Sequence, residues 1–180
     1  MNKTILYIYG YGSNHKDSST MKVVKKVVEE LGYDLVSVEY NQMEPNKGID
    51  DLEKYINDND IKYVIGHSLG GFITMCLGNN VKKLVINPCL HPSDTLPKID
   101  FIPVKTLNEF SKLEKFLFTD NSILSIDDMM GLFGDKDELF SFYDEFKKIF
   151  PKSYKFNSTH RPTLESFTSD IKKKIEKYFD

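Results

Sequence analysis

Tryptophan is absent from this 180-residue chain, and there are only two cysteines. Cys76 and Cys89 have the spacing of neither a metal site nor a disulfide framework, so we expect structural thiols and a reducing compartment. No apolar run reaches the roughly 18 residues of a membrane-spanning helix. The apolar stretch after Lys3 is short and lacks a small-residue cleavage site, unlike a secretory signal. These absences favour a cytoplasmic protein.

A strong charge of one sign is also missing. The net charge of -3 provides no electrostatic attraction for nucleic acid or for an anionic membrane. Lysines alternate with acidic residues on the expected helix faces, which indicates a solvated surface. We therefore expect neither nucleic acid nor a membrane as a partner, and the oligomeric state is left open.

Strand-like and helix-like segments alternate along the chain, which is typical of a parallel sheet covered by helices on both faces. We expect strands at Thr4–Tyr9, Asp34–Tyr40, Lys62–Ile65, Lys83–Asn87, Met129–Phe133 and Ser153–Asn157. We expect helices at Thr20–Leu31, Gly48–Asn57, Leu69–Leu77, Leu107–Phe118, Phe140–Phe150 and Leu164–Phe179. The prediction is one α/β domain over residues 1–180, a three-layer sandwich with about six mostly parallel strands.

A glycine-rich turn follows the third expected strand in YVIGHSLGGF. Gly66, Ser68 and Gly70 match the G-x-S-x-G pattern of a nucleophile elbow between a strand and a helix. Glycines are needed there because the serine backbone is strained and flanking side chains would collide with neighbouring turns. The Leu69 amide would then face a developing oxyanion at a helix N-terminus. The alternative is a tight turn that contains a serine.

A serine needs a base to become a good nucleophile. The chain offers His15, His67, His91 and His160. His67 is next to the serine, but the elbow should direct its side chain away from the hydroxyl. His160 follows the last expected strand, so its loop lies at the same sheet edge as the elbow. We expect His160 to be the base, with a surface loop histidine as the alternative.

An acid that orients the base is expected at another strand end. Asp135 and Asp137 follow the fifth expected strand in GDKDELF, and Asp94 in an earlier loop is a less favoured substitute. The order Ser68, Asp137, His160 is that of an α/β-hydrolase triad. An aspartate pair in a turn is also common turn chemistry, so the residues alone leave Asp135 open.

The loop after the first strand, Gly10 to Ser13, lies beside the elbow if the first and third strands are neighbours. Tyr11 would then supply a second oxyanion N–H. Gly10 and Gly12 match only part of the dinucleotide-binding pattern, which needs a third glycine, so they are weak evidence for such a site. The sequence has no P-loop and no metal-ligand cluster, so we expect no cofactor and no metal.

Together these residues resemble the α/β-hydrolase superfamily and, more narrowly, the small YqiA-like esterases. The resemblance covers nearly the whole chain, in ILYIYGYGSN, VIGHSLGGF, LVINPCLHP, GDKDELF and THRP. It implies Ser68 as nucleophile, His160 as base and Asp137 as acid, with Tyr11 and Leu69 donating to the oxyanion. The implied activity is hydrolysis of short-chain carboxylic esters through an acyl-enzyme.

The chain departs from the family pattern in two places. Tyr9 stands where the family usually has histidine, and Ser158 and Thr159 precede His160 where glycine is common. Neither change removes a triad residue. A non-catalytic binding module of the same fold, and a thioesterase or acyltransferase with the same triad, remain alternatives.

The segment 90–128 is irregular and holds Pro92, Pro97 and Pro103 among many apolar residues. It is either a small cap that lines an acyl pocket or a packing layer over the sheet edge. Without a large lid, the site should be shallow and favour small acyl groups.

Overall fold

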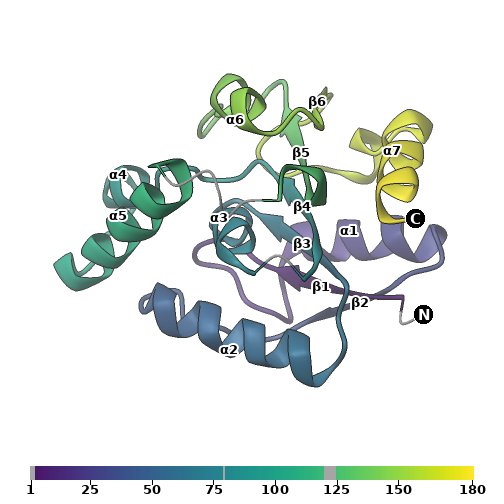
Figure 1. The fold of residues 1–180 in the computed structure, drawn as a ribbon. Helices are drawn as coiled ribbons and strands as arrows, with labels where there is room; N and C mark the ends of the chain where they lie inside the picture. Colours follow the sequence, from purple (N-terminus) through teal and green to yellow (C-terminus); the bar gives the residue numbers. More distant parts are fainter. Residues whose placement is uncertain (1–2, 79, 120–124) are drawn as a thin grey trace.

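The computed structural model describes residues 3–78, 80–119 and 125–180. Six strands form one sheet in the order β2-β1-β3-β4-β5-β6 (Figure 1). Each neighbouring pair is parallel. The predicted α/β fold is therefore confirmed, and the six-stranded sheet is wholly rather than mostly parallel.

All six predicted strands are present, with ends that shift by up to three residues. They are β1 (Thr4–Ile8), β2 (Asp34–Ser37), β3 (Tyr63–His67), β4 (Lys82–Ile86), β5 (Met129–Gly134) and β6 (Ser153–Phe156). After their first residue, β1, β3 and β4 are continuously buried. Helices on both faces of these central strands explain why their residues are buried without alternation.

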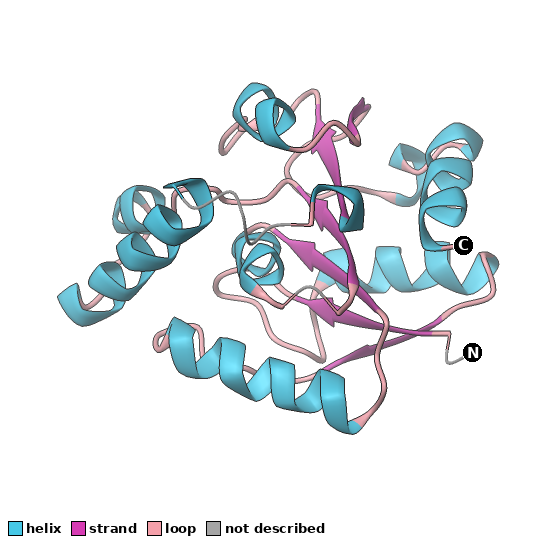
Figure 2. Cartoon of the chain, in the orientation of Figure 1, coloured by secondary structure: helices cyan, strands magenta, loops and turns pink. Residues whose placement is uncertain are grey.

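Helices cover both faces of the sheet, with α1 and α7 on one side and α2, α3 and α6 on the other (Figures 1 and 2). The helices are α1 (Ser19–Glu30), α2 (Pro45–Asp58), α3 (Leu69–Cys76), α4 (Pro92–Thr95), α5 (Val104–Thr119), α6 (Tyr143–Ile149) and α7 (Ser169–Phe179). Short 3-10 turns are η1 (Leu96–Lys98), η2 (Ile126–Asp128) and η3 (Leu164–Ser166). Within the described part of the chain, no helix is both long and apolar enough to cross a bilayer.

Two predicted helices begin later than expected. The closing helix was expected from Leu164, but a capping box between Thr163 and Ser166 closes the separate turn η3 first. The helix expected from Phe140 begins at Tyr143 instead. The Asp137 carboxylate accepts the Phe140 amide, so this stretch forms a turn around the aspartate before α6 begins.

The segment 90–128 contains more helix than the sequence pattern indicates. In Figure 1, α4 and α5 lie side by side at one end of the molecule, and α5 also packs against α2 and α3. Phe110 of α5 is fully buried, with its ring centroid 6.0 Å from that of Phe72. Ile123 and Leu124, two of the apolar residues of this segment, lie outside the described residues.

Lys83 is a buried cation in β4. Its side chain is 2% exposed, and its Nζ donates a hydrogen bond to the Leu77 carbonyl. Burial lowers the pKa of Lys83 from its ordinary value of 10.5 to about 8. The Tyr178 hydroxyl accepts from the Lys83 amide at 3.2 Å and donates to its carbonyl at 3.0 Å, which ties α7 to the sheet.

Lys83 should make the protein more stable as the pH rises. Below its folded pKa the buried ammonium stays charged at a cost, and above it the folded protein releases a proton that the unfolded chain still holds. Between about pH 7.5 and about pH 9.5 the free energy of unfolding should rise by roughly 1–2 kcal/mol from this group. Burial raises the pKa of both cysteines and of several tyrosines, which opposes this rise, so urea unfolding at both pH values should show it as a gain of wild type relative to Lys83→Met.

The matched control is Lys47→Met, which removes an exposed lysine of α2. This control should keep the wild-type gain over Lys83→Met. An equal change in Lys83→Met and wild type would mean that Lys83 is not the titrating group.

Candidate active site

Ser68 lies between β3 and α3 in a backbone conformation that non-glycine residues rarely adopt, with φ 56° and ψ -122°. The Ser68 amide donates to the Ile86 carbonyl at 3.1 Å, and the Ser68 carbonyl accepts from the Cys89 amide at 3.0 Å. Such strain persists only where the surrounding structure enforces it. The glycine-rich motif therefore forms the strained strand-to-helix turn that the sequence predicts.

The glycines around Ser68 leave no room for a side chain. A Cβ on Gly66 would lie 2.3 Å from the Gly70 carbonyl oxygen, and a Cβ on Gly70 would lie 2.1 Å from that of Ile8. A Cβ on Gly10 would lie 3.0 Å from the Ser68 Cβ. Because β1 and β3 are neighbours, the first loop lies directly against the serine.

Asp137 and His160 come from the loops after β5 and β6 and meet through a direct hydrogen bond. Asp137 Oδ2 is 2.8 Å from His160 Nδ1, and the two side chains are only 3% and 4% exposed. The other Asp137 oxygen accepts the amides of Leu139 at 2.9 Å and Phe140 at 3.1 Å. These contacts hold the carboxylate in one orientation against the imidazole.

The charge of Asp137 fixes the tautomer of its partner. Burial raises the pKa of Asp137, but the hydrogen bond and charge of His160 and the two amides outweigh it, so that the net pKa lies below its ordinary value. An ionised carboxylate only accepts hydrogen bonds. His160 Nδ1 is therefore the donor, and in the neutral ring Nε2 is left free to take a proton.

Asp135 makes a different contact. Its Oδ1 accepts the Ser158 amide at 3.1 Å, and Glu138 Oε2 accepts the His160 amide at 3.0 Å. Both carboxylates thus hold the backbone of the loop after β6. Of the two aspartates left open by the sequence, Asp137 is the one that contacts the imidazole.

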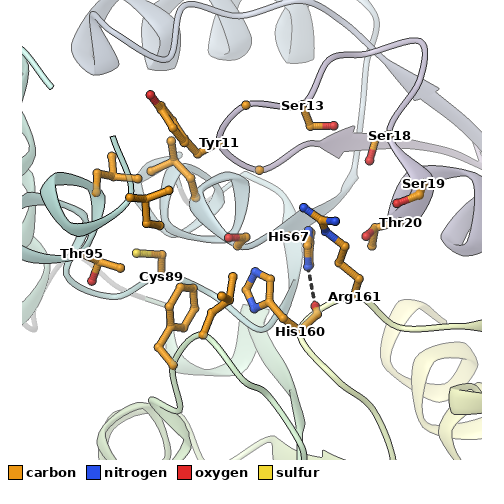
Figure 3. Close-up of a pocket in the computed structure, with 18 of the residues that line it drawn as sticks. Tyr11, Ser13, Ser18, Ser19, Thr20, His67, Cys89, Thr95, His160 and Arg161 are labelled. Atoms are coloured by element: carbon orange, nitrogen blue, oxygen red, sulfur yellow. Dashed lines mark hydrogen bonds between the residues drawn. The ribbon is translucent and has the colours of Figure 1, made fainter. Parts of the chain in front are cut away.

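His67 has a contact that the sequence reasoning missed. Its ring is buried, and its Nε2 lies 2.8 Å from the His160 carbonyl oxygen, as the dashed line in Figure 3 shows. A carbonyl only accepts, so His67 Nε2 carries a proton. Burial, followed by the charge of His160, lowers the pKa of His67 to about 3. The ring is therefore neutral near pH 7 and acts as a hydrogen-bond donor.

Asn87 is a second residue that the sequence reasoning missed. It follows β4 with φ 45°, and its Nδ2 donates to the carbonyls of Thr159 at 3.1 Å and His160 at 2.9 Å. Its Oδ1 accepts the Gly134 amide at 2.6 Å. One amide thus connects the ends of β4, β5 and β6. In the sequence, the one sign of this role is that Asn87 ends a strand and precedes a proline. That pattern fits an ordinary turn equally well.

Ser68, His67 and His160 line one cavity of about 310 Å³ (Figure 3). One wall, called here the apolar wall, consists of Cys89, Leu96, Ile99, Leu139 and Phe140. Among the described residues, no hydrogen bond joins the Ser68 hydroxyl to the His160 ring, a contact that often forms only when substrate binds. No group of three or more His, Cys, Asp or Glu in the same residues is placed to hold a metal ion.

Tyr11 and Leu69, the expected oxyanion donors, line this cavity as well. The first amides of a helix have no acceptor within it, so the Leu69 N–H at the start of α3 can donate to a ligand. Gln42 holds the first loop, because its Nε2 donates to the Gly10 carbonyl at 2.9 Å. Tyr9, in place of the family's usual histidine, stacks on Tyr40 with ring centroids 4.9 Å apart.

Several known hydrolases share this fold. The esterase Pf2001 of Pyrococcus furiosus matches with a TM-score of 0.63 and 18% identity, over 98% of this chain and 81% of that protein's chain. An extracellular alpha/beta-hydrolase from a Paenibacillus species matches with a TM-score of 0.60 and 13% identity, over 98% of both chains. The esterase EaEST of Exiguobacterium antarcticum matches with a TM-score of 0.58 and 14% identity, over 97% and 89%. At these identities the likeness establishes the α/β-hydrolase fold.

A sequence model of an uncharacterised protein family, UPF0227, matches residues 4–130. Comparison with curated proteins gave no match. The matched range includes the first loop and the elbow with Ser68, whereas Asp137 and His160 lie beyond it.

The close approach of Gly70 to β1 should make Gly70→Ala strongly destabilising. The added Cβ would overlap the Ile8 carbonyl, so the elbow has to move away from the sheet. We expect a loss of at least ~2 kcal/mol in the free energy of unfolding, measured by urea titration. Gly78→Ala is the control, since its Cβ would meet no atom nearer than 3.5 Å and should change stability by less than about 1 kcal/mol. Equal effects of the two changes would contradict this account.

Proposed function

The chain belongs to the uncharacterised protein family UPF0227, and we propose that it is a serine hydrolase that cleaves carboxylic esters. The observation that carries this proposal is the buried 2.8 Å contact between Asp137 and His160, since His160 lines the same cavity as Ser68. Within the α/β-hydrolases, we place it with the small YqiA-like esterases that its sequence motifs resemble.

In the proposed reaction, the Ser68 hydroxyl attacks the ester carbonyl while His160 Nε2 takes its proton. Asp137 stabilises the imidazolium, and the N–H groups of Leu69 and Tyr11 donate to the oxyanion. His160 returns the proton to the leaving alcohol, which leaves an acyl group on Ser68. Water then attacks this acyl-enzyme with His160 as the base, and the carboxylic acid is released.

The proposed substrates are esters of short acyl chains. The cavity of about 310 Å³ lies at the lower end of the range for small-molecule sites. We propose that residues 1–180 form one domain, in which one part of the segment 90–128 lines the pocket and another part packs over the sheet edge. Its η1 turn supplies Leu96 to the apolar wall, and α5 serves as a packing layer.

Ser68 should be the residue that reacts with a fluorophosphonate probe. Labelling of wild type should be lost in Ser68→Ala and kept in Ser111→Ala, which removes an exposed serine of α5. In an ester panel, acetate and butyrate esters should be hydrolysed faster than long-chain esters, with a butyryl thioester included to compare the two leaving groups.

Absence of labelling in folded wild-type protein would favour a non-catalytic binding module of the same fold. Faster turnover of long-chain esters would contradict the short acyl pocket and leave the nucleophile in place.

Asp137→Asn should lower kcat/KM by about 10,000-fold, because the neutral amide no longer holds His160 in the reactive tautomer. Asp135→Asn is the matched change two residues away. It keeps an oxygen acceptor for the Ser158 amide, so the loss should stay below about tenfold. Steady-state kinetics on a butyrate ester measure both. Similar losses in the two variants would argue against Asp137 as the acid.

A further inference from the structure

Arginine is used once in this chain, against 23 lysines. The one arginine, Arg161, follows His160 and lines the same cavity. Figure 3 shows its side chain extending past His67 towards Ser18 and Thr20. After burial and His160, the charge of Arg161 is a further cause that lowers the pKa of His67, which agrees with this proximity.

Arg161 has no acidic partner among the residues that the structure describes. In the residues that the structure describes, its guanidinium forms neither an ion pair nor a hydrogen bond with another side chain, although several lysines are paired. A guanidinium presents a planar fork of N–H donors that matches the two oxygens of a carboxylate or phosphate. An unpaired fork at a cavity wall is thus available to an anionic ligand.

The wall opposite the apolar one carries further donors, from the hydroxyls of Ser13, Ser19 and Thr20. Thr20 is only 3% exposed, and its hydroxyl has no hydrogen-bond partner among the described residues. A hydroxyl that lines the cavity without a protein partner is open to a ligand or to water. The same wall contains the N-terminus of the 12-residue helix α1, whose dipole also favours an anion.

Asp17 also lines this part of the cavity and opposes an anion. Its carboxylate lies 3.6 Å from Lys22 Nζ, and its side chain is 76% exposed. Solvent and the lysine therefore screen its charge, whereas Thr20 is buried. This wall, made of Arg161, Ser13, Ser19 and Thr20 and called here the polar wall, is rich in hydrogen-bond donors, and its cation is Arg161.

We propose that the ester hydrolysed at this site carries a carboxylate or phosphate group, which Arg161 and the hydroxyls of the polar wall bind. This inference rests on the proposed ester hydrolysis and names its substrate class. The ester carbonyl lies at Ser68, the apolar part of the substrate faces the apolar wall, and the anion faces Arg161. Arg161 thus selects substrates by charge, and neutral esters lack this contact.

Matched ester pairs test the proposal. One pair places the charge in the acyl part and compares the 4-nitrophenyl half-ester of glutaric acid with 4-nitrophenyl glutaramate, its neutral amide. The other places it in the alcohol part and compares the butyryl esters of glycolic acid and glycolamide. Wild type should prefer the anionic member of at least one pair by about 10- to 100-fold in kcat/KM.

Arg161→Gln should bring this ratio close to one, and Arg161→Lys, which keeps the charge but not the fork, should give an intermediate ratio. The control is Lys26→Gln, which removes a positive charge from an exposed position of α1 and should keep the wild-type ratio. Inhibition by glutarate compared with inorganic phosphate distinguishes the two anions.

The outcomes separate this inference from the proposed function. A wild-type enzyme that is labelled at Ser68 but hydrolyses both members of both pairs equally overturns the anion site and leaves the hydrolase standing. If wild type is not labelled, the anion site is tested by calorimetry with glutarate. Binding of glutarate that is lost in Arg161→Gln and kept in Lys26→Gln supports the site. No binding of glutarate or phosphate by such an unlabelled protein overturns it.

Discussion

The carbonyl oxygen of His160 accepts two hydrogen bonds from buried neutral side chains, and the geometry of the site depends on them. His67 donates from the end of β3 and Asn87 from the residue after β4. Together they fix the loop after β6 against the two central strands. The imidazole of His160 is then oriented from its backbone as well as through Asp137, which agrees with the general need of such sites for rigid support around the reacting groups.

The donor role of His67 depends on its lack of charge. Burial lowers the pKa of His67 to about 3, so the ring stays neutral across the range in which an ordinary histidine titrates. A second imidazolium beside His160 would oppose the positive charge that His160 acquires in the proposed proton transfer. Burying His67 thus keeps it as a structural donor without electrostatic competition, although it neighbours the serine in sequence.

The fold and the main contacts of the site were predictable because they follow local rules. Apolar runs predicted all six strands, and the spacing of Gly66, Ser68 and Gly70 predicted the elbow. Parallel strands share one carboxyl edge, which made the meeting of the Asp137 and His160 loops predictable as well. The choice between Asp135 and Asp137 depended on which side chain turns inward, and a turn with two aspartates does not encode that.

The remaining features depend on contacts between segments far apart in sequence. In the sequence alone, Asn87 looks like an ordinary turn residue. Its role becomes visible only in the folded structure, where three strand ends meet around its side-chain amide. The sequence alone does not place Arg161 at the cavity that the first loop and the start of α1 also line. The late start of α6 has the same origin, since the carboxylate that orients His160 also holds the amides that would begin the helix.

That double use of Asp137 joins the chemistry of the site to its shape. Leu139 and Phe140, whose amides the carboxylate accepts, also contribute side chains to the cavity wall. Any change of charge or position at Asp137 therefore moves part of the surface that contacts the substrate. In the proposed reaction, substrate preference and proton transfer therefore cannot change independently at this loop. The η1 side of the cavity, where Leu96 lies, offers positions away from Asp137 at which specificity could change.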